Sequence, residues 1–312
     1  MRRTLQALFV CFMLLPGVAV IAADRFTVYT VNYPLQYFAE RIGAEHVEVV
    51  FPAPSGVDPA FWKPDSDILR QYQKADLVLL NGAGYAGWVE KVSLPRLKQV
   101  NTSAVFVASY IEKTSGPTHS HGPAGDHSHA GTAFTTWLDF YQAAQQAEAI
   151  KQALSKRLPT YAADFERNYQ ALHRDLMKLD LDMQRTVASK PEQPFFASHP
   201  VYHYLARRYE LHIRDMVWEP DSMPDDGQWE QLRYIREEFL ANWMLWEQQP
   251  SNSIEHKLQG MDISIAVFDP CGNRPARGDF LDVMQRNISA LKQAYAGRHS
   301  QANPGKYVQL LN

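Results

Sequence analysis

Short apolar runs alternate with amphipathic segments in two separate blocks of this chain, and this alternation constrains the fold more than any other feature. In the first block the pattern predicts strands over 25–31, 46–51 and 76–82, with helices over 34–43 and 63–75 between them. Such β-α-β-α alternation predicts a parallel sheet with helices on both faces.

The same alternation returns in the second block, after a long helical stretch. Apolar periodicity predicts helices over 140–158 and 160–188, the second about 29 residues or 44 Å long. We therefore predict an α/β protein of two lobes, each with a mostly parallel sheet flanked by helices, joined by one long spine helix. The predicted parts are an amino-terminal lobe (24–158), a connecting helix (159–189) and a carboxyl-terminal lobe (190–312). In the second block, strands are predicted over 194–198, 211–218, 242–247 and 262–269, and helices over 202–209, 225–240, 251–260 and 278–296.

Residues 1–23 have the pattern of an export signal. Arg2 and Arg3 precede an apolar run that ends at Ala22 and Ala23, so cleavage near Ala23 and a periplasmic location are expected. Removing them takes two of the 31 basic residues and none of the 34 acidic ones, which leaves a mildly acidic chain and argues against nucleic acid as a partner. The remaining part keeps one cysteine, Cys271, which excludes an intramolecular disulfide. We expect a monomer.

Ligands of open α/β sheets bind just beyond the carboxyl ends of the strands, and four places with candidate residues fit this description. In the first lobe, Asp58 to Ala60 follow a predicted strand and Trp137 to Asp139 follow the loop over 113–131; in the second, His199 follows a predicted strand and Asp269 closes one. The sequence therefore predicts a cleft between the lobes.

Several longer motifs extend over nearly the whole mature chain: "GVDPAFWKP", "KADLVLLNGAGYAGWVEK", "TTWLDF", "SHPVYHYLARRYEL", "WEPDSMPDDGQWEQL" and "FDPCG" with "FLDVMQRNISAL". Together they resemble the periplasmic solute-binding proteins of zinc and manganese ABC importers. The resemblance implies two α/β lobes on one long helix, with a metal ion held in the cleft by four side chains. It also implies an inner-membrane ABC permease as partner.

The ligand positions implied by this resemblance are only half retained. His199 and Asp269 stand at the two carboxyl-lobe positions, but Ala60 and Thr135 stand where the family has histidines. Zinc sites use three or four protein ligands, so two alone predict weak binding.

A histidine-rich loop, predicted over 113–131, offers a second supply of metal ligands. It contains His119, His121, His127 and His129, and in an extended segment the members of each H-x-H pair face the same side. Our hypothesis is that the loop collects metal and donates one or two imidazoles to His199 and Asp269. The alternative is a hydrophilic loop that is rich in histidine without binding metal. Whether the loop completes the site or only buffers metal stays open at this point.

Other candidates have a structural interpretation that we favour over ligation. His203 follows His199 by four residues, His173 lies on the spine helix, and Cys271 is a lone cysteine. Glu219 and Asp221 follow a strand but are expected to cap the next helix. Phe61, Trp62 and Trp137 are expected to form a wall of the cleft.

The sequence thus predicts a periplasmic binding protein that captures a divalent metal ion and delivers it to a permease. Zinc is expected, with manganese, nickel or copper as alternatives. A second hypothesis is a binding protein of the same fold that takes a metal chelate or an organic solute. A zinc-dependent hydrolase is disfavoured because the sequence has no H-E-x-x-H and no G-x-S-x-G motif, so we predict no enzymatic activity.

Overall fold

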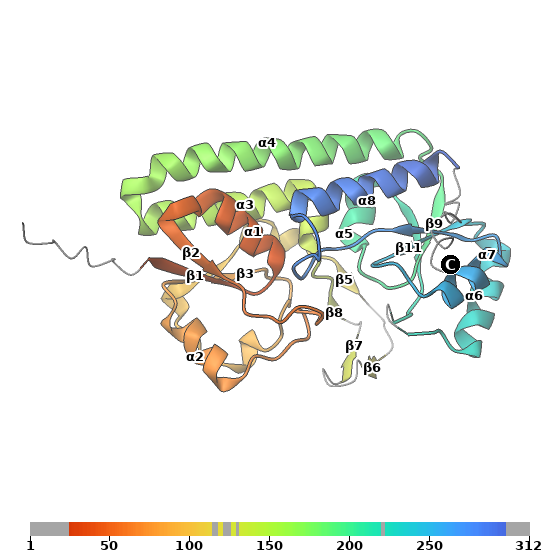
Figure 1. The fold of residues 1–312 in the computed structure, drawn as a ribbon, viewed down its shortest axis with the longest axis horizontal. Coiled ribbons are helices and arrows are strands. Elements are labelled where there is room, and N and C mark those ends of the chain that lie inside the picture. Colours follow the sequence, from red (N-terminus) through yellow and green to blue (C-terminus); the bar gives the residue numbers. More distant parts are fainter. Residues whose placement is uncertain (1–24, 114–117, 121–125, 129–130, 220–221, 298–312) are drawn as a thin grey trace, which may run out of the picture.

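Two α/β lobes, each with a four-stranded parallel sheet, make up the chain in the computed structural model, which describes residues 25–113, 118–120, 126–128, 131–219 and 222–297 (Figure 1). The amino lobe has the strand order β2-β1-β3-β4 and the carboxyl lobe has the order β10-β9-β11-β12. The predicted fold class is confirmed. The strands are β1 (Phe26–Thr30), β2 (Val47–Val50), β3 (Leu77–Leu80), β4 (Gln99–Asn101), β9 (Pro194–Ala197), β10 (His212–Asp215), β11 (Trp243–Trp246) and β12 (Ser264–Val267).

Burial explains which strands the sequence predicted well. All four residues of β11, an inner strand, are buried, as expected for a parallel sheet covered on both faces. The edge strand β4 was not predicted, because Val100 is its only apolar residue. The turn after β3 requires a glycine. Gly82 has φ +77°, and a Cβ at this position would lie only 2.1 Å from the Ser103 hydroxyl oxygen.

The helix α4 (Ala162–Val187) spans the molecule above both sheets and packs on α1, α3 and α8 (Figure 1). Its 26 residues correspond to about 39 Å. Its buried face, which includes Phe165, Leu172, Leu176 and Met183, repeats at helical spacing. Nowhere in the described part of the chain is a helix both long and apolar enough to cross a membrane. The other helices are α1 (Tyr33–Gly43), α2 (Ser66–Lys74), α3 (Phe140–Arg157), α5 (His203–Tyr209), α6 (Asp226–Glu238), α7 (Asn252–Gln259) and α8 (Phe280–Tyr295).

The segment predicted as a loop between 113 and 131 contains two short antiparallel ladders. One pairs β5 (Glu112–Lys113) with β8 (Gly131–Thr132), and the other pairs β6 (Thr118–Ser120) with β7 (Asp126–Ser128). Strands in a hairpin pair through backbone groups and need no apolar side chains. We predicted strands from runs of apolar residues, so these two ladders were missed.

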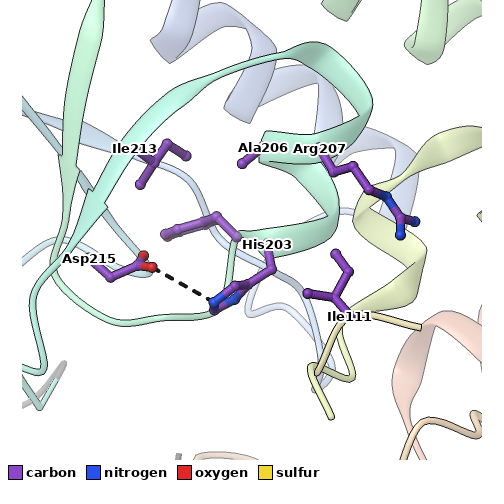
Figure 2. Close-up of a pocket in the computed structure, with 7 residues that line it drawn as sticks. Ile111, His203, Ala206, Arg207, Ile213 and Asp215 are labelled. Carbon is purple, nitrogen blue, oxygen red and sulfur yellow. Dashed lines mark ion pairs between the residues drawn. The ribbon is translucent and has the colours of Figure 1, made fainter. Parts of the chain in front are cut away.

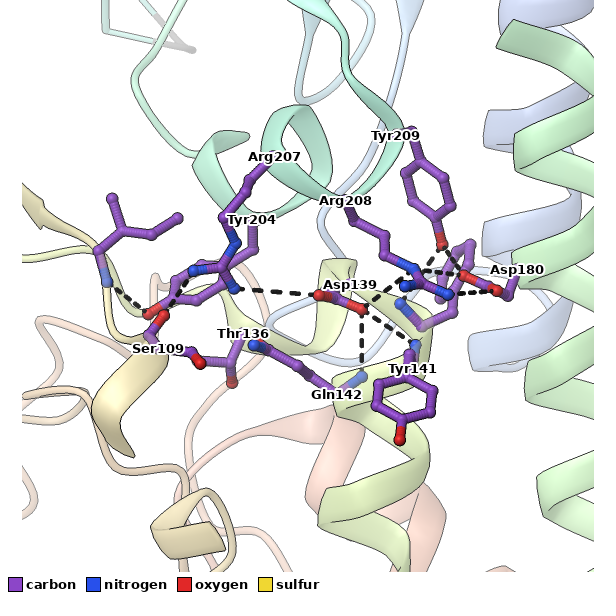
Figure 3. A network of polar contacts seen from close by, with 12 residues as sticks. Ser109, Thr136, Asp139, Tyr141, Gln142, Asp180, Tyr204, Arg207, Arg208 and Tyr209 are labelled. Atoms are coloured by element: carbon purple, nitrogen blue, oxygen red, sulfur yellow. Dashed lines mark hydrogen bonds and ion pairs between the residues drawn. The ribbon is translucent and has the colours of Figure 1, made fainter. Parts of the chain in front are cut away.

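The short helix α5 of the carboxyl lobe is bonded to both the amino lobe and α4 (Figure 3). Arg208 donates to the Asp180 carboxylate on α4 at 3.0 and 2.8 Å and lies 3.7 Å from Asp139, the residue that caps α3. The Arg207 guanidinium donates to the backbone carbonyl of Ser109. These charge-assisted bonds hold the two lobes against each other on one side of the cleft described next.

Candidate functional site

A cleft of about 1000 Å³ lies between the lobes, at the carboxyl ends of their strands. Each strand of the carboxyl lobe is followed within four residues by a titratable side chain that lines this cleft. His199 follows β9, Glu219 follows β10, Glu247 follows β11 and Asp269 follows β12. The sheet topology therefore gathers these four side chains at one edge.

His199 is the most deeply buried of the four, with 5% of its surface exposed. Its Nδ1 lies 2.9 Å from the Glu247 carboxylate, a contact that orients the ring and increases its basicity. Burial disfavours the charged imidazolium, but Glu247, with smaller contributions from Glu219 and Asp58, outweighs burial and raises the pKa of His199. This is the arrangement of a metal-binding histidine held by a carboxylate.

Asp269 is fixed by its own turn and by α8. Its carboxylate accepts the backbone N–H of Cys271 at 2.7 Å, and Asn287 on α8 bonds both the amide and the carbonyl of Asp269, at 3.0 and 2.7 Å. Burial, together with the charge of Glu247, raises the pKa of this carboxyl group although Cys271 opposes the shift. The predicted pair His199 and Asp269 therefore lines one cleft on rigid supports.

Asp58 faces this pair from the amino lobe. Its carboxylate accepts the backbone N–H of Ala60 at 2.9 Å and interacts electrostatically with His199 and Glu247. The side chain is accessible to solvent within the cleft but surrounded by protein, which raises its pKa to about 6. The amino lobe thus contributes a carboxylate to the cleft, two residues before Ala60.

Five aromatic side chains line the amino-lobe half of the cleft: Phe61, Trp62, Tyr85, Phe134 and Trp137. We call the four that contact one another, which are all but Trp62, the aromatic recess. Tyr85 contacts Phe134 and Trp137 edge to face, with centroids 5.3 and 5.7 Å away, and Phe61 contacts Phe134 in the same way at 6.0 Å. The indole N–H of Trp137 donates to the Pro270 carbonyl at 2.7 Å. The recess is therefore continuous, and it is tied to the carboxyl lobe beside Asp269.

The two amino-lobe positions at which the family resemblance implies histidines have packing roles here. Ala60 is 6% exposed and belongs to the hydrophobic core of the amino lobe. Thr135 lines the cleft, and its hydroxyl donates to the backbone carbonyl of Val201, two residues after His199. Thr135 therefore connects the lobes directly.

The loop histidines fall largely outside the described residues. His121 and His129 are not described, and His119 and His127 are described only as backbone partners in the β6–β7 ladder. Among the residues that the structure does describe, no three His, Cys, Asp or Glu side chains are grouped closely enough to hold a metal ion.

His203 lies in a separate, smaller pocket of about 340 Å³ (Figure 2). Its Nε2 is 3.8 Å from the Asp215 carboxylate, and Ile111 of the amino lobe closes one side. Burial, with the charge of Lys113, lowers the pKa of His203 to about 4, and burial raises the pKa of Asp215 to about 6. The structure thus places His203 in a different pocket from His199.

The remaining candidates have simple surroundings. Glu219 lines the cleft, and Asp225 is the N-cap of the following helix α6. The prediction that Glu219 caps this helix was therefore wrong. Asp221 lies outside the described residues. His173 packs near Tyr169, with ring centroids 5.7 Å apart. Cys271 is buried, which raises the pKa of its thiol.

Sequence reasoning missed Glu247 and gave no role to Tyr85. Glu247 directly follows the most apolar strand of the carboxyl lobe, so the rule that ligands bind at strand ends could have identified it. Tyr85 follows a glycine turn rather than a strand, and no pattern in the sequence marks it.

The chain matches, over residues 28–294, the family model described as zinc-uptake complex component A, periplasmic (ZnuA). The chain belongs to this family. The resemblance inferred from the motifs is therefore confirmed, and the family is one of metal-binding, substrate-binding proteins of ABC transporters.

Individual relatives differ in the metal that their names state. The chain is 22% identical over 310 residues to the zinc-binding protein AdcA of Streptococcus pyogenes serotype M3, covering 93% of this chain and 60% of AdcA. It is 24% identical over 258 residues to the manganese-binding lipoprotein MntA of Halalkalibacterium halodurans, covering 80% and 81%. The fold is similar to that of the Zn(II)-bound ZnuA-like domain of Streptococcus pneumoniae AdcA, with a TM-score of 0.73, 20% identity and coverage of 86% and 98%. The chain thus spans less than two thirds of the length of full AdcA.

Proposed function

We propose that this protein is a periplasmic solute-binding protein that captures a divalent metal ion, zinc, in the interlobe cleft and delivers it to an ABC permease. The observation that carries the proposal is the buried His199, held through Nδ1 by Glu247 at 2.9 Å beside Asp269. Such a carboxylate-held imidazole presents its other nitrogen to a metal in a fixed direction. The protein performs no catalytic step in this proposal.

Replacing His199 tests the proposed function directly. His199→Ala is expected to weaken zinc binding by more than about 100-fold. Mutating a residue that only hydrogen-bonds to a metal ligand typically reduces metal affinity by about 10- to 100-fold, and the loss of the ligand itself should cost more. The measurement is competition with a chromogenic chelator on metal-stripped protein. His173→Ala, which removes a half-buried histidine from α4, is the matched control and should leave affinity unchanged. Equal affinities for the two variants would contradict the proposal.

We further propose that the segment between β5 and β8 supplies imidazoles to this metal. Its histidines, 119, 121, 127 and 129, belong to a segment whose two ends pair next to the cleft, where Lys113 is a lining residue. Neutral imidazole suits zinc, and the described cleft residues do not by themselves complete a site.

Replacing all four histidines of this segment by alanine tests their role. Zinc affinity is expected to fall by about tenfold, while His199→Ala causes the larger loss. Replacing Thr114, Ser115, Ser120 and Ser128 by alanine instead is the control for changing four polar residues in the same segment. An unchanged affinity in the histidine variant would show that the segment contributes no ligand.

A further inference from the structure

The cleft contains a buried hydroxyl group that a bare metal ion would not require. Tyr85 is 7% exposed, and among the described residues its hydroxyl has no hydrogen-bond partner. It lies beside Gly272 of the carboxyl lobe, where a Cβ would be 3.7 Å from the hydroxyl oxygen. Leaving a buried hydroxyl unbonded costs about 1–3 kcal/mol, so a ligand that bonds it gains affinity at this position.

The size of the cleft also exceeds what one ion and its donors occupy. Protein ligands lie about 2.0–2.3 Å from zinc, whereas pockets for small organic ligands measure about 300–1000 Å³. The cleft, at about 1000 Å³, belongs to the second class. The aromatic recess lines the half of it that faces His199 from the amino lobe, and aromatic walls are typical of sites for organic ligands.

Charges of both signs line the cleft. Four carboxylates, Asp58, Glu219, Glu247 and Asp269, lie in it together with the cationic side chains of Lys63, Lys113 and Arg274. A zwitterion satisfies such a surface, because its ammonium group is attracted to the carboxylates and its carboxylate to the lysines. A polyanionic chelator would be repelled by the four carboxylates.

We propose that the cleft binds its metal in a ternary complex with a small zwitterionic, ring-bearing chelator of the amino-acid type. The nitrogen and oxygen donors of the chelator add to His199 around the metal, its ring lies in the aromatic recess, and the Tyr85 hydroxyl bonds it. This inference rests on the proposed function, because it takes His199 as the protein ligand of the metal. With zinc alone, the histidines between β5 and β8 supply the nitrogen donors, as proposed above; in the ternary complex the chelator takes their place, and the experiment separates these two sources.

The test is native mass spectrometry and isothermal titration of the full mature protein with zinc, L-histidine, citrate, and zinc with either chelator. A ternary mass of protein, zinc and L-histidine is expected, and none with citrate. Tyr85→Phe should weaken the ternary complex by about tenfold, which is the effect of one hydrogen bond, and leave binding of zinc alone unchanged. Tyr295→Phe is the matched control, because Tyr295 is also buried with no hydrogen-bond partner for its hydroxyl among the described residues, but lies at the end of α8 against Phe195.

The outcomes distinguish this inference from the proposed function. Zinc bound without L-histidine in every spectrum, or equal ternary affinities for Tyr85→Phe and Tyr295→Phe, would overturn the chelator and leave metal capture standing. If replacing the four histidines between β5 and β8 by alanine abolishes the ternary complex, the nitrogen donors to the metal belong to that segment. This result would also overturn the chelator inference. If His199→Ala still binds zinc and the ternary complex as the wild type does, the proposed function itself fails.

Discussion

The two halves of the cleft are built from different chemistry. The carboxyl-lobe half carries His199, Glu219, Glu247 and Asp269 at the ends of four adjacent strands, so the sheet itself fixes their positions. The amino-lobe half carries the aromatic recess and one carboxylate, Asp58, on loops. Under the proposed function, the residues that would anchor the metal are therefore concentrated in one lobe, while the other lobe offers a surface suited to an organic group.

Hydrogen bonds between the lobes, including one from Thr135, also distinguish this cleft from one closed by a metal alone. A metal with ligands from both lobes would itself hold the lobes together, but here the Thr135 hydroxyl bonds the Val201 carbonyl, and Asn273 bonds the Pro54 and Val57 carbonyls at 2.7 and 2.8 Å. Direct hydrogen bonds therefore join the lobes at two places. We expect the cleft to change shape little when its cargo binds.

Between the two halves of the cleft, the largest effect on zinc affinity is expected at Glu247, in the carboxyl-lobe half that carries His199. Glu247→Gln keeps the size of the side chain but removes the charge that orients and polarises His199, so zinc affinity should fall by about tenfold. Chelator competition measures this, with Glu238→Gln at the exposed end of α6 as the control. A variant that binds zinc as tightly as the control would show that the 2.9 Å contact has no part in metal binding.

A smaller effect is expected for Asp215, which lies outside the cleft: its titration should change the free energy of unfolding with pH. Because burial raises the pKa of Asp215 to about 6, the folded state favours its protonated form, and its contribution to stability declines as pH rises from about 4 to above 6. Its side chain is 33% exposed, so solvent reduces the effect to about 1 kcal/mol. Asp215→Asn should remove this decline.

Urea denaturation at pH 4.5 and 7.5 measures that change. The free energy of unfolding of Asp215→Asn relative to wild type should rise by about 1 kcal/mol between these two pH values. The difference at pH 4.5 serves as the reference for any effect of the substitution on packing. A constant difference between wild type and variant would mean that Asp215 titrates normally in the folded protein.

The smallest effect is expected in the aromatic half, for zinc alone. Phe134→Leu removes a ring from the aromatic recess without touching a metal donor, so affinity for zinc without a chelator should stay within about twofold of wild type. The same competition assay measures it. A loss of zinc affinity comparable to that of Glu247→Gln would show that the aromatic recess also contributes to metal binding, and that the two halves of the cleft do not differ in this role.

The fold could be predicted from the sequence wherever apolar pattern and burial coincide. The apolar runs that became β3 and β11 and the long periodic stretch that became α4 are examples. The strand β4 and the ladders β5–β8 and β6–β7 were missed, because backbone pairing at edges and in hairpins leaves little trace in side-chain pattern.

The site was less predictable than the fold. His199 and Asp269 were predicted because they lie at strand ends and match family motifs. In the sequence, Glu247 looks like any solvent-exposed glutamate, and only the structure shows its carboxylate in contact with the His199 Nδ1. Tyr85 could not be found, because its importance lies in the hydroxyl group that the fold buries without a partner among the described residues. Residues that act through burial or orientation need the three-dimensional arrangement.

The proposed role of His199 as a metal ligand is tested most directly by anomalous scattering at the zinc edge from crystals of metal-loaded protein prepared without a histidine tag. We predict one strong peak in the interlobe cleft, about 2.0–2.1 Å from a ring nitrogen of His199. A zinc peak elsewhere with none at His199, or a cleft filled by an organic molecule without metal, would contradict it.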